Sequence, residues 1–268
     1  MKKIYVIAAI VLVVSSCTVN NVTVDDGLKK YFDEYHVDGT FALYDNSRGQ
    51  HTIYNQKRDT TRFLPASTFK IFNALVGLQT GKLLNDSAIL KWDGIVRENR
   101  PEWNKDLSLY QAFRLSALPH FQGLARSIGK DTMQRYIDSV HYGNGKISKI
   151  DSFWIDNSLK ISADEQEWFV KLLYFRQLPF RHSVQEQVKK MMIWENNATY
   201  QLAYKTGWGQ TENGNELGWI VGWIEENRHV YFFAMNLETA DHQIDMKTVR
   251  KKILDNILSD MGFFKGKM

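Results

Sequence analysis

One short segment of the chain combines a nucleophile with a base. Ser67-Thr68-Phe69-Lys70 places a hydroxyl and an amine three residues apart, and positions three apart share a face of a helix. A serine hydroxyl becomes a good nucleophile only when a neighbouring base removes its proton. Backbone N–H groups at the start of a helix also help to bind an oxyanion. This spacing predicts nucleophilic catalysis by Ser67, with Lys70 as the base.

Lys70 can act as a base only if its surroundings keep it neutral. The ordinary lysine pKa is about 10.4, so holding the amine neutral at pH 7 costs about 4 to 5 kcal/mol. Burial supplies this because it disfavours the charged form. Apolar side chains that could surround the amine are Phe69 and Phe72 nearby, and Leu118 and Trp154 from other segments.

The Ser-x-x-Lys spacing also has a structural interpretation, because it occurs by chance. In that interpretation Ser67 caps the helix and Lys70 is exposed. The chain contains a second match, Ser127-Ile128-Gly129-Lys130. Its glycine stands where a helix is expected to end, so we interpret the second match as a solvated helix terminus.

Lys205-Thr206-Gly207 lies late in the chain, at the end of a predicted strand. Alone, this tripeptide is typical of a strand entering a turn. Following a Ser-x-x-Lys helix, it is typical of penicilloyl-serine transferases. A glycine lets substrate backbone approach closely, Thr206 can bond a substrate carboxylate, and Lys205 adds positive charge.

The pattern of the remaining sequence predicts an α+β domain. Strands are predicted at Thr40–Asp45, His51–Asn55, Thr199–Thr206, Leu217–Glu225 and His229–Leu237. Helices are predicted after Ser67 as far as Gly81, at Leu107–Leu118, Phe121–Ile128 and Thr132–Val140, after the capping boxes Ser162/Glu165 and Ser183/Glu186, and at Asp245–Met261. Strands from both ends would form an antiparallel sheet flanked by helices, with a helical subdomain of about 80–195 inserted.

The N-terminus predicts export. Lys2 and Lys3 precede an apolar run and two serines, as in a signal peptide of residues 1–16. Cys17, the single cysteine, follows them, so it is a candidate for lipidation that would anchor the protein to a membrane; the alternative is that Cys17 is discarded with the leader. Residues 17–38 would form a tether and first helix, residues 39–268 the catalytic domain, and the location would be periplasmic.

Several ordered motifs together resemble the class D (oxacillinase-type) serine β-lactamases, from about Thr40 to about Ile257. The matching stretches are Pro65-Ala66-Ser67-Thr68-Phe69-Lys70, Ser116-Ala117-Leu118, Tyr142-Gly143-Asn144, Phe153-Trp154-Ile155 and Lys205-Thr206-Gly207-Trp208. Gly218-Trp219 and Gly222-Trp223 also stand where the family has strand glycines and tryptophans.

The resemblance implies a role for each catalytic position. Ser67 would be acylated by the β-lactam and freed by water. Lys70 would carry a carboxyl group from CO2 or bicarbonate, Trp154 would donate its indole N–H to that group, and Ser116 would relay a proton to the leaving nitrogen, with Lys205 beside it. Substrate would be bound by Leu118, Thr206, Gly207 and Trp208, and Tyr142-Gly143-Asn144 would be a structural turn.

The chain departs from the family at two positions. Leu118 stands where the family usually has valine. An arginine that binds the substrate carboxylate, at the start of the last helix in many members, aligns without gaps to Met246. Lys247 and Arg250 are nearby and either could take its place, although Arg250 would be one helical turn away.

Three other functions stay open. A β-lactam sensor domain would be acylated at Ser67 without turnover, a transpeptidase would act on peptidoglycan stem peptides, and a structural lipoprotein would do neither. Lys plus Arg total 34 against 30 Asp plus Glu without a dense basic run, so no nucleic-acid partner is expected. The seven histidines lack ligand spacing, so no metal is expected. The protein would be a monomer or homodimer.

Overall fold

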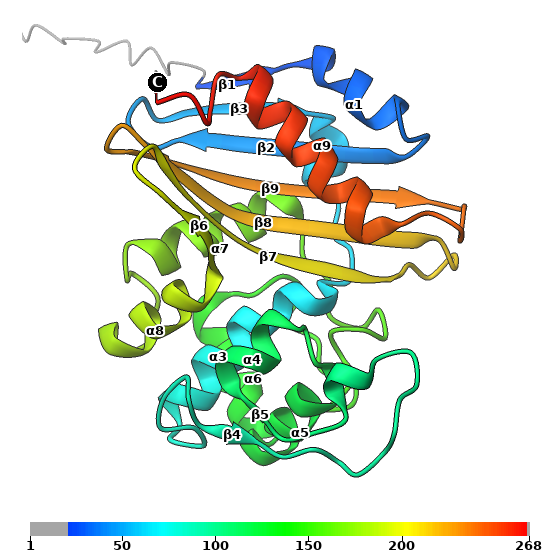
Figure 1. Ribbon diagram of the computed structural model, residues 1–268, viewed down its shortest axis with the longest axis vertical. Coiled ribbons are helices and arrows are strands. Elements are labelled where there is room, and N and C mark those ends of the chain that lie inside the picture. The colour runs from blue at the N-terminus through cyan, green and yellow to red at the C-terminus, as the bar shows by residue number, and fades with distance from the viewer. Residues whose placement is uncertain (1–20, 267–268) are drawn as a thin grey trace, which may run out of the picture.

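The computed structural model describes residues 21–266 (Figure 1). The predicted signal peptide, residues 1–16, and Cys17 lie outside the described residues. Within residues 21–266, no helix is both long and apolar enough to cross a bilayer.

A seven-stranded sheet holds strands from both ends of the described chain side by side. Its order is β1-β3-β2-β9-β8-β7-β6. The strands are β1 (Val22–Val24), β2 (Asp38–Asp45), β3 (Gln50–Tyr54), β6 (Ile193–Asn196), β7 (Tyr200–Gln210), β8 (Glu216–Glu226) and β9 (His229–Thr239). Neighbouring strands in this sheet are antiparallel, except that β1 runs parallel to β3. The α+β fold is therefore confirmed, with a parallel pairing added at one edge of the expected antiparallel sheet.

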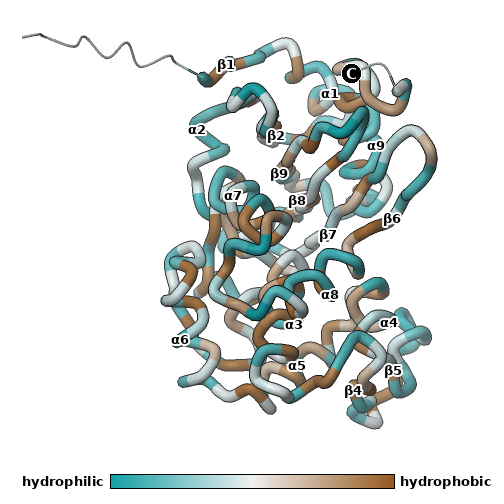
Figure 2. Tube along the Cα trace, turned by 90° about the vertical axis from the view of Figure 1, so that its left-hand side faces the viewer, coloured by the Kyte–Doolittle hydropathy of each residue, from teal (hydrophilic) through white to brown (hydrophobic). Residues whose placement is uncertain are grey.

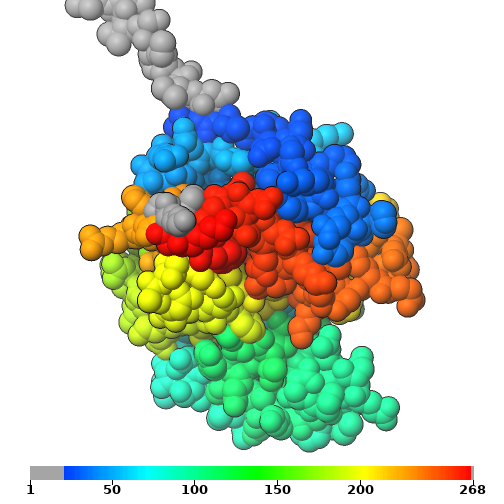
Figure 3. Space-filling model, turned by 45° about the horizontal axis from the view of Figure 1, so that its top comes forward, coloured from blue at the N-terminus to red at the C-terminus, as the bar shows by residue number. Residues whose placement is uncertain are grey.

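Helices cover both faces of the sheet, which explains why residues 217–224 of β8 are all buried. On one face, α1 (Lys29–Asp33) and α9 (Met246–Asp260) complete an apolar core. Figure 3 shows the red C-terminal helix beside the blue N-terminal residues on this side. On the other face, α3 (Lys70–Gln79) and α7 (Ala163–Tyr174) contribute to the larger core.

The region between β3 and β6 is mainly helical. It contains α2 (Gln56–Asp59), α4 (Leu109–Arg114), α5 (Leu118–Ile128), α6 (Lys130–Val140), α8 (His182–Met192) and the small pair β4 (Ile89–Leu90) and β5 (Leu107–Ser108). The part from α3 to α6 lies below the sheet in Figure 1, whereas α7 packs against β2 and β9. A hydrophobic colouring runs along much of α3 at the centre of this part (Figure 2).

Several local signals in the sequence are confirmed. The backbone N–H of Ser162 donates to the Glu165 carboxylate at the start of α7, and Asp245 caps α9. Gly81 follows the end of α3 with φ of +71°. The second Ser-x-x-Lys match is the exposed junction between α5 and α6, where Gly129 has φ of +83°.

Two helix predictions are wrong in their bounds. The predicted helix Leu107–Leu118 is in fact parts of two helices. Ser108 caps α4, the left-handed backbone of Ser116 separates α4 from α5, and α5 begins at Leu118. Pro119 favours this new start because proline fits the first turn of a helix.

The predicted capping box Ser183/Glu186 is also absent. Helix α8 begins at His182, which places Ser183 inside its first turn. Arg181, the residue before the helix, bonds Gln79 and the Leu78 carbonyl on α3. These tertiary contacts fix where α8 begins, and the sequence around Ser183 does not show them.

Candidate active site

Ser67 lies in a buried turn that leads into α3. A short 3-10 helix, Ala66–Phe69, precedes α3. Ala66 has φ of +49°, a left-handed conformation that is uncommon for residues other than glycine. The Ala66 N–H donates to the Trp154 carbonyl at 3.0 Å, which holds the turn in place. The strained turn therefore fixes the position from which the Ser67 hydroxyl acts.

Lys70 is completely buried and reaches Ser67. Its Nζ donates to the Ser67 Oγ at 2.6 Å, and its side chain is 0% exposed. Burial lowers the pKa of Lys70 to about 7. The structural interpretation, a cap with an exposed lysine, is therefore wrong, and the amine is placed to take a proton from the hydroxyl.

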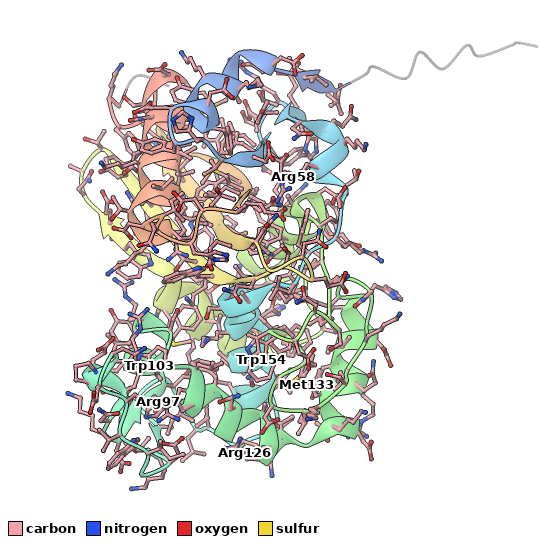
Figure 4. All side chains as sticks on the ribbon, turned by 90° about the vertical axis from the view of Figure 1, so that its right-hand side faces the viewer. Arg58, Arg97, Trp103, Arg126, Met133 and Trp154 are labelled. Atoms are coloured by element: carbon pink, nitrogen blue, oxygen red, sulfur yellow. The ribbon has the colours of Figure 1, made fainter. Side chains whose placement is uncertain are left out.

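Aromatic side chains surround this pair. Trp154 is fully buried and stacks on Phe69, with ring centroids 5.5 Å apart. Figure 4 shows Trp154 beside α3 inside the molecule. Lys70 Nζ also lies 5.5 Å from the Phe121 ring centroid, and Leu118, half-buried at the start of α5, packs against the same core. Low polarity around Lys70 explains its lowered pKa.

The indole N–H of Trp154 has no hydrogen-bond partner among the described residues, although it is buried. A buried donor without an acceptor is unfavourable by about 1 to 3 kcal/mol. The same donor is suited to an anionic group close to the α3 N-terminus. The Trp154 indole N–H is therefore an unused donor beside the turn that carries Ser67.

A second serine–lysine pair faces the first from other elements. Lys205 Nζ donates to Ser116 Oγ at 2.5 Å and to the Thr206 carbonyl at 3.1 Å. Ser116 has φ of +52° in the turn between α4 and α5. Burial lowers the pKa of Lys205 well below its ordinary value, and the charges of Lys70 and Arg250 lower it further.

The strand that carries Lys205 passes close to the Ser67 turn. A Cβ atom at Gly207 would lie 2.9 Å from the Pro65 carbonyl oxygen and 3.3 Å from Thr68 Cγ2. Only glycine allows this approach. Thr206 and Trp208 alternate with Gly207 and point to the other face of the sheet; Thr206 is half-buried and Trp208 is 44% exposed. Strand β7 runs on to Gln210, so the motif lies within the strand and not at its end as predicted.

Arg250 reaches the same strand from α9. Its side chain is 7% exposed, and Nη1 donates to the Gly207 carbonyl at 2.5 Å. Burial lowers the pKa of Arg250 to about 10. Met246 is buried against Gly218, and Lys247 is exposed. Of the three residues near the expected arginine position, Arg250 is therefore the one at the site.

The Tyr142-Gly143-Asn144 segment has a structural role, as predicted. Gly143 has φ of +55°, and a Cβ atom there would lie 2.1 Å from the Lys160 carbonyl oxygen. Asn144 donates to the Ser158 carbonyl. The Tyr142 ring packs against Phe69 and Phe72, with ring centroids 5.6 Å and 5.2 Å apart.

The electrostatic character of the site is cationic. Lys70, Arg250 and Arg114 lie close enough to Lys205 for their charges to lower its pKa. Such a cluster attracts an anionic substrate. In the part of the chain that the structure describes, no three His, Cys, Asp or Glu side chains are grouped so that they could hold a metal ion.

Sequence reasoning missed one contributor to the site and left another undecided. Phe121 was assigned only to an apolar helix. Arg250 and Lys247 were both candidates to replace the arginine, and Arg250 is the one that falls on the buried face of α9 with Met246, Val249, Ile253 and Leu254. The sequence held a signal for Arg250: this cation recurs at helical spacing with apolar residues, which places it on the face of the last helix that turns to the core.

Comparison with known proteins agrees with this geometry. The family described as "Penicillin binding protein transpeptidase domain" matches residues 39–259. Beta-lactamase OXA-5 of Pseudomonas aeruginosa is 38% identical over 97% of this chain and 98% of its own. The crystal structure of FUS-1 (OXA-85), a class D β-lactamase from Fusobacterium nucleatum subsp. polymorphum, is 37% identical with a TM-score of 0.85, over 91% of this chain and 100% of that one.

A receptor is similar as well. The C-terminal domain of the Bacillus licheniformis BlaR penicillin-receptor is 35% identical with a TM-score of 0.85, over 91% of this chain and 98% of that one. The fold is thus shared by enzymes and a receptor. Because the identity to the β-lactamases extends over nearly the full chain, the protein belongs to the class D serine β-lactamases.

Proposed function

We propose that this protein hydrolyses the β-lactam amide bond through an acyl-enzyme on Ser67, with carboxylated Lys70 as general base in both acylation and deacylation. The observation that carries the proposal is the fully buried Lys70 amine, 2.6 Å from the Ser67 hydroxyl, with its pKa lowered to about 7. An amine with this pKa is substantially neutral at physiological pH, and a neutral amine is the form that adds CO2.

The carboxyl group would supply an oxygen base, and the residues around it would hold and shield it. The unpartnered Trp154 indole N–H is a donor suited to its negative charge. The Phe121 ring lies 5.5 Å from the Lys70 amine, which is fully buried and so shielded from bulk water. These contacts support the carboxylated form of Lys70.

The second serine–lysine pair would serve the leaving nitrogen. When Ser67 attacks the carbonyl, the amide C–N bond breaks and its nitrogen needs a proton. Ser116, hydrogen-bonded to Lys205, is suited to pass one on. Thr206, Lys205 and Arg250 present hydroxyl and cationic groups to the substrate carboxylate.

The alternative is a sensor that is acylated without turnover, and the similarity to the BlaR domain favours it as the second candidate. A chromogenic cephalosporin distinguishes the two. We expect many turnovers per protein, stimulated by bicarbonate and lost below about pH 6, where Lys70 is protonated. A single stoichiometric burst would select the sensor. Absence of any reaction would contradict both.

We also propose a periplasmic location, with Cys17 as a lipid anchor. The support is the order of Lys2, Lys3, the apolar run and Cys17 in the sequence. Mass spectrometry of the membrane fraction is the test: a diacylglyceryl Cys17 supports the anchor, and a mature N-terminus beyond Cys17 contradicts it.

A further inference from the structure

The outer edge of β7 is open beside the active site. Strand β6 pairs with β7 only as far as Ala203. From Lys205 to Gln210, the outer edge of β7 therefore has no partner strand among residues 21–266, while its inner edge pairs with β8 along its whole length. An open strand edge can take an extended substrate backbone. A large side chain at this edge controls which substrates fit.

Trp208 is that large side chain, and a hydrogen bond holds its indole towards β8. Its Nε1 donates to Glu216 Oε2 at 2.6 Å. Glu216 is the first residue of β8, the inner neighbour of β7. Gly218, which is paired with Trp208 across the two strands, has no side chain to hold the indole. The hydrogen bond therefore draws the polar edge of the ring towards β8 and away from the open edge.

Glu216 is itself firmly held. Its other oxygen, Oε1, accepts from Gln210 Nε2 at 2.7 Å and lies 2.9 Å from His242 Nδ1. The residue is 7% exposed. Burial alone would raise the pKa of Glu216, but hydrogen bonds from Gln210, His242 and Trp208 outweigh burial and lower it. Glu216 is therefore an ionised acceptor, and charge-assisted hydrogen bonds of this kind are strong.

We propose that Glu216 is a positioning residue that holds the Trp208 indole against β8 and so keeps the outer edge of β7 open to β-lactams with bulky acylamino groups. The inference rests on the proposed hydrolytic function and adds to it a determinant of substrate choice. Without this acceptor, the half-exposed indole is free to rotate to other side-chain rotamers. Some of these rotamers cover the edge and obstruct large substituents more than small ones.

The experiment compares two penicillins that differ only in the size of the acylamino group. Glu216→Leu keeps a side chain of similar size but removes the acceptor, and Glu216→Gln keeps one acceptor oxygen. Glu212→Leu is the matched control, because Glu212 lies in the same hairpin and bonds only Lys160 at the surface. We expect Glu216→Leu to lower the bulky-to-small ratio of kcat/KM about tenfold, Glu216→Gln to lower it less, and Glu212→Leu to leave it unchanged.

A double variant separates positioning from general destabilisation. In the Trp208→Ala background, adding Glu216→Leu should leave the ratio unchanged, because the group that Glu216 positions is gone. The proposal is overturned if Glu216→Leu changes the ratio less than twofold, or if it lowers the ratio equally with and without Trp208. Should Glu216→Leu fail to fold, Glu216→Gln is judged by the same criterion. Failure of the wild type to turn over either penicillin would instead contradict the proposed function, and the ratio of acylation rates would then test Glu216.

Discussion

Among the parts of residues 21–266 that bury titratable side chains, the active site and the region around Asp59 differ in whether a reacting group is present. At the active site, burial lowers the pKa of Lys70 to about 7. Between α2, β3 and α7, burial raises the pKa of Asp59 to about 7, and the nearby carboxylates of Asp164 and Glu167 raise it further. The two groups thus titrate at similar pH for the same reason, the loss of hydration on burial.

Lys70 and Asp59 differ in whether a nucleophile lies beside them. Lys70 lies 2.6 Å from the Ser67 hydroxyl, and the turn that carries Ser67 packs against β7. Asp59 Oδ1 has no hydrogen-bond partner among the described residues, and no hydroxyl or thiol is bonded to it there. Glu167, in the same region as Asp59, lies 3.7 Å from His51. His51 is an ion-pair partner of Glu167 and does not act as a nucleophile there. A perturbed pKa therefore identifies a catalytic group only when a reacting partner lies within hydrogen-bonding distance.

Removal of the Lys70 amine should have the largest effect on activity. We expect Lys70→Ala to lower kcat by about 10³-fold or more, because the base for both half-reactions is lost. Steady-state hydrolysis of a penicillin measures this. Lys130→Ala is the control, since Lys130 belongs to the exposed second Ser-x-x-Lys match and should keep full activity. Unchanged hydrolysis by Lys70→Ala would remove Lys70 from the mechanism.

Trp154→Phe tests the donor proposed to hold the carboxyl group. Phenylalanine keeps an aromatic ring, although a smaller one, and removes the unpartnered indole N–H, so we expect kcat to fall about 10²-fold and to recover in part at high bicarbonate. Carbon-13 NMR with labelled bicarbonate should show a weaker carbamate signal than in the wild type. Trp168→Phe, an exposed tryptophan, should change neither quantity. A full carbamate signal in Trp154→Phe would contradict this role.

Arg250→Ala tests whether the buried arginine binds the substrate carboxylate. Loss of a charged hydrogen bond worth about 2 kcal/mol corresponds to a rise in KM of about 30-fold, with a smaller effect on kcat. Because Arg250 is buried, Arg250→Lys serves as a second variant that keeps the charge. Lys247→Ala should leave KM unchanged, since Lys247 is exposed. Equal effects of Lys247 and Arg250 replacement would contradict the assignment.

Asp59→Asn tests the second region and should not change activity. The folded protein holds a proton on Asp59 at pH values where the unfolded chain, with a pKa of 3.8, has lost it. Stability from this group is therefore present at low pH and is lost as pH rises from about 4 to about 7. We expect Asp59→Asn to raise the free energy of unfolding at pH 8 by up to about 4 kcal/mol and to change it little at pH 4.

Urea unfolding at the two pH values measures this effect, with the exposed Glu98→Gln as control. A loss of hydrolysis in Asp59→Asn would contradict the comparison, because it would show that the second region takes part in the reaction. Equal stabilisation at both pH values would contradict the pKa argument alone.

The catalytic motifs and most of the helices and strands follow from residues that are close together in the sequence. Ser67 and Lys70, the order of the later Lys205-Thr206-Gly207, the strands and the final helix from Asp245 onward were all predictable. These features depend on neighbours a few residues apart: alternation along a strand, spacing on a helix, and a side chain that caps its own helix. Interactions of such short range are visible in the order of residues.

The contacts between distant residues, in contrast, depend on how the helices and the sheet pack together. Ser116 accepts a hydrogen bond from Lys205, 89 residues away. Arg250 donates to the Gly207 carbonyl, 43 residues away. Glu216 on β8 accepts from Trp208 on the neighbouring strand β7. Each contact depends on how the sheet and helices pack, and burial of Lys70 depends on Phe121 from a different helix. The pKa values and the directions of these side chains follow from the whole packed interior, because hydration is lost only when distant parts of the chain close around a group.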